Sequence, residues 1–246
     1  MAQRIKGILF DLGDTLLHFG PVDIASVFEA GAHLAYEYVK KLGFALPPFA
    51  KYHRRQLRAI RLRVAWSRLT GREFNSLDLL VSMARRMGHH ISPQQALEQV
   101  WLGYKPLSKC ASKEEGLVEL LEGFRRSGLI LGLISNTFIP GEVLDRHLEV
   151  EGLLDLLSVR VYSCQVRYRK PHPKIFAAAL LRTGLKASET LFVGDSLRAD
   201  IRGANRAGMI SVLKDPTQRR LHPNIRPCHR IRNLLDLADL VAQYNG

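Results

Sequence analysis

Three short segments end in polar residues that could handle a metal ion and a phosphoryl group. The segment ILFDLGDTLL turns from apolar residues to Asp11, LISN ends in Ser135 and Asn136, and TLFVGDS places Asp195 after an apolar run. Mg²⁺ takes oxygen ligands, of which only one or two are carboxylates. We therefore expect Asp11 and Asp195 to bind Mg²⁺, and Asp200 to support the metal through a water molecule or a hydrogen bond to a ligand.

A lysine in the segment RKPHPKIF can supply the positive charge that a phosphoryl group needs. Pro171 disfavours a helical conformation at Lys170, and Pro173 marks the start of a helix, so the lysine is expected on a loop. Ser135 offers a hydroxyl, and backbone amides beside it could donate to phosphate oxygens. Because phosphoryl transfer depends mainly on positioning and charge neutralisation, Asp11 is a candidate nucleophile that would form an aspartyl-phosphate.

Short apolar strands that alternate with helices must position these residues. From about residue 106, the predicted strands are LILGLISN, TLFVGD and ISVLK, and the predicted helices are EEGLVELLEGFRRSG, KIFAAALLRTG and RADIRGANRAGM. Together with the opening strand GILFDL, this order favours an α/β fold with a parallel sheet covered on both faces. Ligands of such sheets bind beyond the carboxyl ends of the strands, so the polar strand ends are expected to meet at one edge.

A helical segment interrupts the alternation after the first strand. Apolar residues recur at helical spacing in IASVFEAGAHLAYEYVKKLGF and in YHRRQLRAIRLRVAWSRLTG, where Leu57, Ile60 and Val64 share a face. A third helix, SLDLLVSMARRMGHH, is expected to begin with Ser76 as its N-cap.

The length and composition fit a chain of two parts. We predict a core of residues 1–18 and 106–246 and a helical insertion of residues 19–105. The chain has no run of about 18 apolar residues and no signal-peptide pattern, so we expect a cytoplasmic protein without a membrane span. The three cysteines are widely spaced, which argues against a disulfide framework.

The chain is strongly basic, with a formal net charge of +13. Arg54, Arg58 and Arg61 share a helix face within residues 51–72, which contain no acid, and QRRLHPNIRPCHRIR near the C-terminus is also basic. Such residues can form a solvated face or attract an anionic substrate. Nucleic-acid binding is not favoured, because no known binding motif or interleaved aromatic residues accompany the charge. The oligomeric state stays open.

The motifs, taken in order, resemble those of the haloacid dehalogenase-like superfamily of hydrolases. The matching segments are FDLGDTL, LISN, RKPHPKIF and VGDSLRADIRGANRAGM, which are spread along most of the chain. The resemblance implies that Asp11 is the nucleophile and a metal ligand, and that Asp195 binds the metal with support from Asp200. It implies that Ser135 and Lys170 are catalytic and bind phosphate. It also implies that Thr15 and Asn136 bind phosphate.

The resemblance also implies a fold and an activity. The fold is a Rossmann-like, doubly wound parallel sheet with an inserted helical cap of the C1 type, which closes over the site and selects the substrate. The activity is Mg²⁺-dependent hydrolysis of a small, anionic phosphomonoester.

One position departs from the pattern of the family's phosphatases. They usually carry Asp two residues after the nucleophile, where it protonates the leaving oxygen and then activates water. This chain has Gly13 there, which can still offer Mg²⁺ the backbone carbonyl that the resemblance implies as a ligand. Asp14 replaces the acid only if the loop turns its side chain inward, and is otherwise a turn residue.

Two alternatives to the phosphatase stay open. Dehalogenases of the family also lack this acid, because a halide leaves without a proton, but their fourth motif typically lacks GDS and they do not need Mg²⁺. The intact GDS segment and Asp200 therefore favour the phosphatase. The second alternative is a catalytically weak member that keeps the phosphate site for binding.

Overall fold

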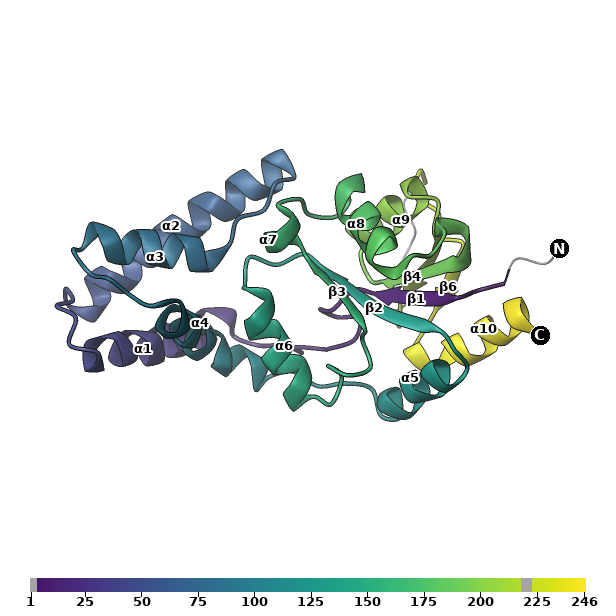
Figure 1. Ribbon diagram of the computed structural model, residues 1–246, viewed down its shortest axis with the longest axis horizontal. Helices are drawn as coiled ribbons and strands as arrows, with labels where there is room; N and C mark the ends of the chain where they lie inside the picture. Colours follow the sequence, from purple (N-terminus) through teal and green to yellow (C-terminus); the bar gives the residue numbers. More distant parts are fainter. Residues whose placement is uncertain (1–3, 218–222) are drawn as a thin grey trace.

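A parallel sheet forms the centre of the molecule (Figure 1). The computed structural model describes residues 4–217 and 223–246, and within these ranges the sheet has six strands in the order β3-β2-β1-β4-β5-β6. The strands are β1 (Gly7–Phe10), β2 (Ile130–Ser135), β3 (Val159–Tyr162), β4 (Thr190–Gly194), β5 (Ile210–Lys214) and β6 (His229–Ile231). All neighbouring strands are parallel. The α/β prediction is confirmed, although β3 and β6 were not predicted.

Helices cover both faces of this sheet. They are α5 (Leu117–Arg126), α6 (Gly141–Val150), α7 (Ser163–Val166), α8 (Pro173–Thr183), α9 (Arg202–Arg206) and α10 (Leu237–Asn245), with shorter helical turns at Ala187–Glu189, Leu197–Ile201 and Leu234–Asp236. Successive side chains of a strand point to opposite faces. Ile8 and Phe10 of β1 therefore pack in one cluster with α5, α6 and α10, whereas Leu9 packs with α8 and α9. This is the expected doubly wound arrangement.

Four helices lie between β1 and α5 along the chain and form the helical insertion. They are α1 (Ile24–Lys41), α2 (Phe49–Thr70), α3 (Ser76–Arg86) and α4 (Pro93–Ser108). In Figure 1 they lie at the end of the molecule opposite the two termini. Glycine permits close packing of α1 on α4, because a Cβ atom at Gly31 would lie 2.0 Å from the carbonyl oxygen of Gly103.

Two details of the helical insertion differ from expectation. Helix α4 was not predicted, and it continues past residue 105 to Ser108. The N-cap of α3 is Asn75 rather than Ser76, because Asn75 has an extended backbone and its side chain accepts a hydrogen bond from Leu77 N. Ser76 is already the first helical residue, so its hydroxyl is not used as the cap.

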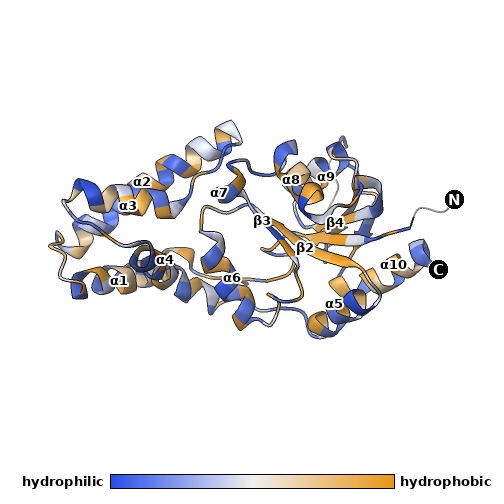
Figure 2. Ribbon diagram, in the orientation of Figure 1, coloured by the Kyte–Doolittle hydropathy of each residue, from blue (hydrophilic) through white to orange (hydrophobic). Residues whose placement is uncertain are grey.

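The hydropathy of the residues follows the layers of the fold (Figure 2). Strand β2 is largely orange in Figure 2, as expected for a strand covered on both faces, while the outer helices show both colours. Arg54, Arg58 and Arg61 are exposed and line one shallow groove beside α2. Part of the basic C-terminal segment, residues 218–222, lies outside the described residues. No helix in the described ranges could span a membrane.

Candidate active site

Three acids meet at the carboxyl edge of the sheet. Asp11 follows β1, Asp195 follows β4, and Asp200 lies in the helical turn after β4. One oxygen atom from each carboxylate lies within 4.8 Å of the others. Gly194 makes this approach possible, because a Cβ atom at this position would lie 2.5 Å from the Asp200 side chain. The Asp200 Oδ2 atom is held by a hydrogen bond from Ser196 N.

Lys170 contacts two of these acids, Asp11 and Asp200. Its Nζ atom lies 2.5 Å from Asp11 Oδ1 and 2.7 Å from Asp200 Oδ1, and the residue is buried. Burial lowers the pKa of Lys170, but the Asp11 and Asp200 carboxylates outweigh burial and hold this pKa above its ordinary value. The lysine is therefore a cation inside the site.

The loop residues around Lys170 position it as the sequence suggested. Helix α8 begins at Pro173, as predicted, so Lys170 lies on the loop before it. The side-chain amide of Asn136 bonds to both the N–H and the carbonyl of Lys170. Asn136 thus positions the lysine through its side chain, which leaves its backbone as the part that could face phosphate. Ser135 is buried at the end of β2 and lines the adjoining cavity.

The electrostatics of Asp11 reflect its buried surroundings. The pKa of Asp11 is raised to about 7, mainly because the carboxyl is buried. The charges on Asp200 and Asp195 also raise this pKa, whereas the Lys170 ammonium lowers it. A cation bound among these carboxylates would favour their ionised forms.

The oxygen atoms around Asp11 fit a magnesium ion. Asp200 Oδ1, although close to Lys170, makes no well-directed hydrogen bond to the described residues. Among the residues that the structure describes, no backbone N–H donates a hydrogen bond to the Gly13 carbonyl. Carboxylate and carbonyl oxygens are the donors that Mg²⁺ prefers. Asp11, Asp195 and the Gly13 carbonyl could therefore hold Mg²⁺ with Asp200 beside it.

A family model covers most of this architecture. The model of haloacid dehalogenase-like hydrolases matches residues 5–208. The chain belongs to this family. The resemblance seen in the four motifs is confirmed, and so is the Rossmann-like α/β core.

Proteins with which this hydrolase can be compared include phosphatases that are similar in sequence and a dehalogenase that is similar in fold. It is 29% identical to the ribulose-1,5-bisphosphate 5-phosphatase of Halopiger xanaduensis, over 96% of this chain and 98% of the relative. It is 27% identical to the phosphoserine phosphatase of Thermus thermophilus, over 95% and 98% of the two chains. The crystal structure of a 2-haloacid dehalogenase from Pseudomonas syringae superimposes with a TM-score of 0.65, at 20% identity, over 98% and 99% of the chains. That structural likeness establishes the fold alone.

The turn after β1 sets this hydrolase apart from the family's phosphatase pattern. Leu17 closes the turn, because it accepts a hydrogen bond from Asp14 N at 2.7 Å and donates one to Leu12 O at 2.9 Å. Asp14 has a φ of 58° and an exposed side chain, whereas Gly13 does not use a left-handed φ. Asp is among the few residues that tolerate this region. The structure therefore places Asp14 as a turn residue.

Behind the turn lies a buried lysine, Lys214, that was not predicted from the sequence. Lys214 Nζ donates to the Thr15 carbonyl at 2.8 Å and lies 2.6 Å from Glu114 Oε1 and 2.7 Å from His18 Nε2. Thr15 is fully buried, and its hydroxyl has no hydrogen-bond partner among the described residues. Its contact with phosphate stays a prediction. The available signal for Lys214 was its place at the end of the apolar segment ISVLK.

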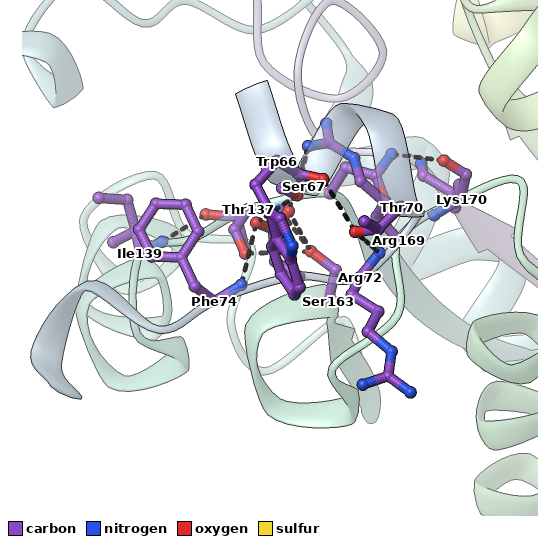
Figure 3. A network of polar contacts seen from close by, with 12 residues as sticks. Trp66, Ser67, Thr70, Arg72, Phe74, Thr137, Ile139, Ser163, Arg169 and Lys170 are labelled. Atoms are coloured by element: carbon purple, nitrogen blue, oxygen red, sulfur yellow. Dashed lines mark hydrogen bonds and ion pairs between the residues drawn. The ribbon is translucent and has the colours of Figure 1, made fainter. Parts of the chain in front are cut away.

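A second unpredicted network joins the loop after α2 to the core beside Lys170 (Figure 3). Glu73 is buried, its Oε1 atom accepts a hydrogen bond from Ser67 Oγ at 2.9 Å, and its Oε2 atom lies 3.3 Å from Ser163 Oγ. Arg169 donates to Ser67 Oγ at 2.9 Å and lies 3.4 Å from Glu73. The helical insertion is thus anchored to the residue next to Lys170.

Proposed function

We propose that this hydrolase is a Mg²⁺-dependent phosphatase that acts on a small phosphomonoester through an aspartyl-phosphate on Asp11. The observation that carries the proposal is the contact of Lys170 with Asp11 and Asp200, with Asp195 within reach of the same metal position. Two relatives that match along nearly their whole length are named as phosphatases, which supports phosphoester chemistry.

The proposed reaction has two displacements at phosphorus. The Asp11 carboxylate attacks the phosphorus, and the bond to the alcohol oxygen breaks with its electron pair on that oxygen. Water then attacks the phosphorus of the aspartyl-phosphate, and the bond between phosphorus and the Asp11 oxygen breaks, which releases inorganic phosphate and restores the carboxylate. The proton that water loses balances the proton that the alcohol oxygen takes up from solvent. Lys170 and the Ser135 hydroxyl hold the phosphoryl oxygens and stabilise their charge. Bound Mg²⁺ supplies further positive charge to these oxygens.

Gly13 gives this reaction a particular dependence on the leaving group. It has no side chain that could protonate the departing oxygen, and Asp14 is exposed in the turn. An aryl oxide leaves without a proton far more readily than an alkoxide does. We therefore expect aryl phosphates to react faster than simple alkyl phosphates.

Turnover of 4-nitrophenyl phosphate with Mg²⁺ and with excess EDTA tests the proposal. Phosphate release should require Mg²⁺, and acid quenching should trap phosphate on wild-type protein but not on Asp11→Asn. Release that persists in EDTA, or full turnover by Asp11→Asn, would contradict it. Halide release from a 2-haloacid without metal would instead favour the dehalogenase alternative.

A further inference from the structure

A cavity of about 420 Å³ extends from the proposed phosphate site into the helical insertion. Gly13, Ser135 and Asn136 line it on the side of the core. Its other walls are mainly apolar and come from all four inserted helices, for example Phe28, Ile60, Val64, Met83 and Leu107. The volume lies in the range of sites that enclose small organic ligands.

Helix α2 contributes an apolar face that other side chains leave partly uncovered. Leu57, Ile60 and Val64 line the cavity, and all three are only half-buried. In the whole of α2, only Tyr52 and Ser67 are buried. Apolar side chains around an unfilled volume lose the dispersion contacts and the burial that a filled one would provide. An apolar occupant of the cavity would therefore stabilise the folded protein.

Two polar atoms of the cavity wall lack a hydrogen-bond partner within the part of the chain that the structure describes. The Nδ1 atom of His53 and the Oγ atom of Ser76 are buried and make no hydrogen bond to the described residues. Ser76 lies beside the core, because its N–H donates to the Phe138 carbonyl. An apolar pocket with a few polar groups is the usual composition of a site that binds and orients an organic molecule.

We infer that this cavity binds the alcohol part of the substrate, and that this part carries an alkyl or aryl group. The inference rests on the proposed function for the position of the phosphate. The occupant follows from continuity, because the same cavity is lined by Ser135 at one end and by the apolar face of α2 at the other. The substrate class is then a phosphomonoester with an apolar tail rather than a polar sugar phosphate.

A series of 4-alkylphenyl phosphates, from unsubstituted to hexyl, tests this inference with Mg²⁺ present. The acidity of the phenol changes little along the series, so a trend reports on binding rather than on the leaving group. We expect kcat/KM to rise about threefold to fourfold per methylene until the cavity is filled. A flat or falling series would overturn the inference.

Matched tryptophan substitutions locate the effect within α2. Val64→Trp should fill the cavity and reduce the ratio of kcat/KM for the hexyl and ethyl compounds to about one. This ratio compares two substrates of one preparation, so it does not depend on the fraction of folded protein. Leu69→Trp is the control, because Leu69 is 87% exposed and does not line the cavity. It should keep the wild-type ratio, and an equal loss in both variants would contradict the assignment.

Calorimetric binding of n-alkylphosphonates, from methyl to octyl, separates this inference from the proposed function. These probes cannot be hydrolysed. Affinity that increases with chain length, with an increasingly negative heat capacity change, would support the apolar site even if no phosphoester were turned over. Suppose that turnover depends on Mg²⁺ but the affinity for the phosphonates does not change with chain length. This result would support the phosphatase proposal and overturn the inference that the cavity binds an apolar group.

Discussion

Asn136 holds the main chain of Lys170 with both atoms of its side-chain amide. Lys170 N donates to Asn136 Oδ1 at 2.6 Å, and Asn136 Nδ2 donates to the Lys170 carbonyl at 3.0 Å. Asn136 follows β2, so the sheet determines where the loop before α8 begins its approach to the site. The position of Lys170 Nζ beside Asp11 therefore depends on a residue that need not touch the substrate.

Asn136→Ala should reduce kcat by about 100-fold, because small displacements of a catalytic group have effects of this size. Steady-state kinetics with 4-nitrophenyl phosphate measure it, and thermal unfolding checks the fold. Asn205→Ala is a matched control, since the side chain of Asn205 also donates to a backbone carbonyl, that of Arg226, away from the site. A loss below twofold in Asn136→Ala would show that other contacts hold Lys170.

The rate should depend on the ionisation of Asp11. The pKa of this carboxyl is raised to about 7 by burial, and the nucleophile is the ionised form, so activity should fall as the pH decreases below about 7. Bound Mg²⁺ favours the carboxylate, so raising its concentration should move the acid limb to lower pH. Rate profiles at limiting and saturating Mg²⁺ measure the shift. An acid limb at the same pH in both would exclude Asp11 as its origin.

Asp11 and Asp14 should respond differently to the same isosteric change. Asp11→Asn removes the nucleophile and should lower kcat by at least about 1000-fold. Asp14→Asn should leave kcat within about threefold, because the side chain is exposed and Asn also tolerates a left-handed φ. Kinetics of the two variants on one substrate provide the comparison. A large loss in Asp14→Asn would restore its role as a displaced acid.

Gly13→Asp should introduce the missing general acid. The site has room, because a Cβ atom at Gly13 would have Phe19 Cε2 at 4.0 Å as its nearest neighbour. We expect turnover of an alkyl phosphate to rise by up to about 100-fold, with a smaller gain for 4-nitrophenyl phosphate. Gly13→Asn, which cannot donate a proton in this way, is the control. Equal gains in both variants would point to a steric cause.

The contact between Glu73 and Arg169 should stabilise the chain. Glu73→Ala leaves Ser67 and Arg169 without their buried acceptor, which should cost about 2 kcal/mol and lower the Tm. Glu149→Ala, at an exposed position, should change stability by less than about 0.5 kcal/mol. Thermal unfolding of both variants measures the difference. Equal Tm values would show that the network contributes no net stability.

Much of the core follows from the sequence alone, because buried parallel strands leave a strong local pattern. Strands β1, β2, β4 and β5 are mainly apolar and buried, and each is followed by a polar residue. Strand β3 lacks this pattern, since Arg160 interrupts it and pairs with Asp145, and β6 has three residues. The apolar face of α2 could also be predicted, because its spacing is periodic.

Other properties depend on contacts between residues far apart in the chain. The side chain of Asn136 bonds to a loop 34 residues away, and Arg169 meets Ser67 across 102 residues. The orientation of Asp14 depends on how Leu17 closes the turn, and the cavity exists only between helices and core. Local patterns report which residues prefer burial or a turn. The packing of distant segments decides which of these residues meet. It thereby determines where Lys170 lies and what shape the cavity has.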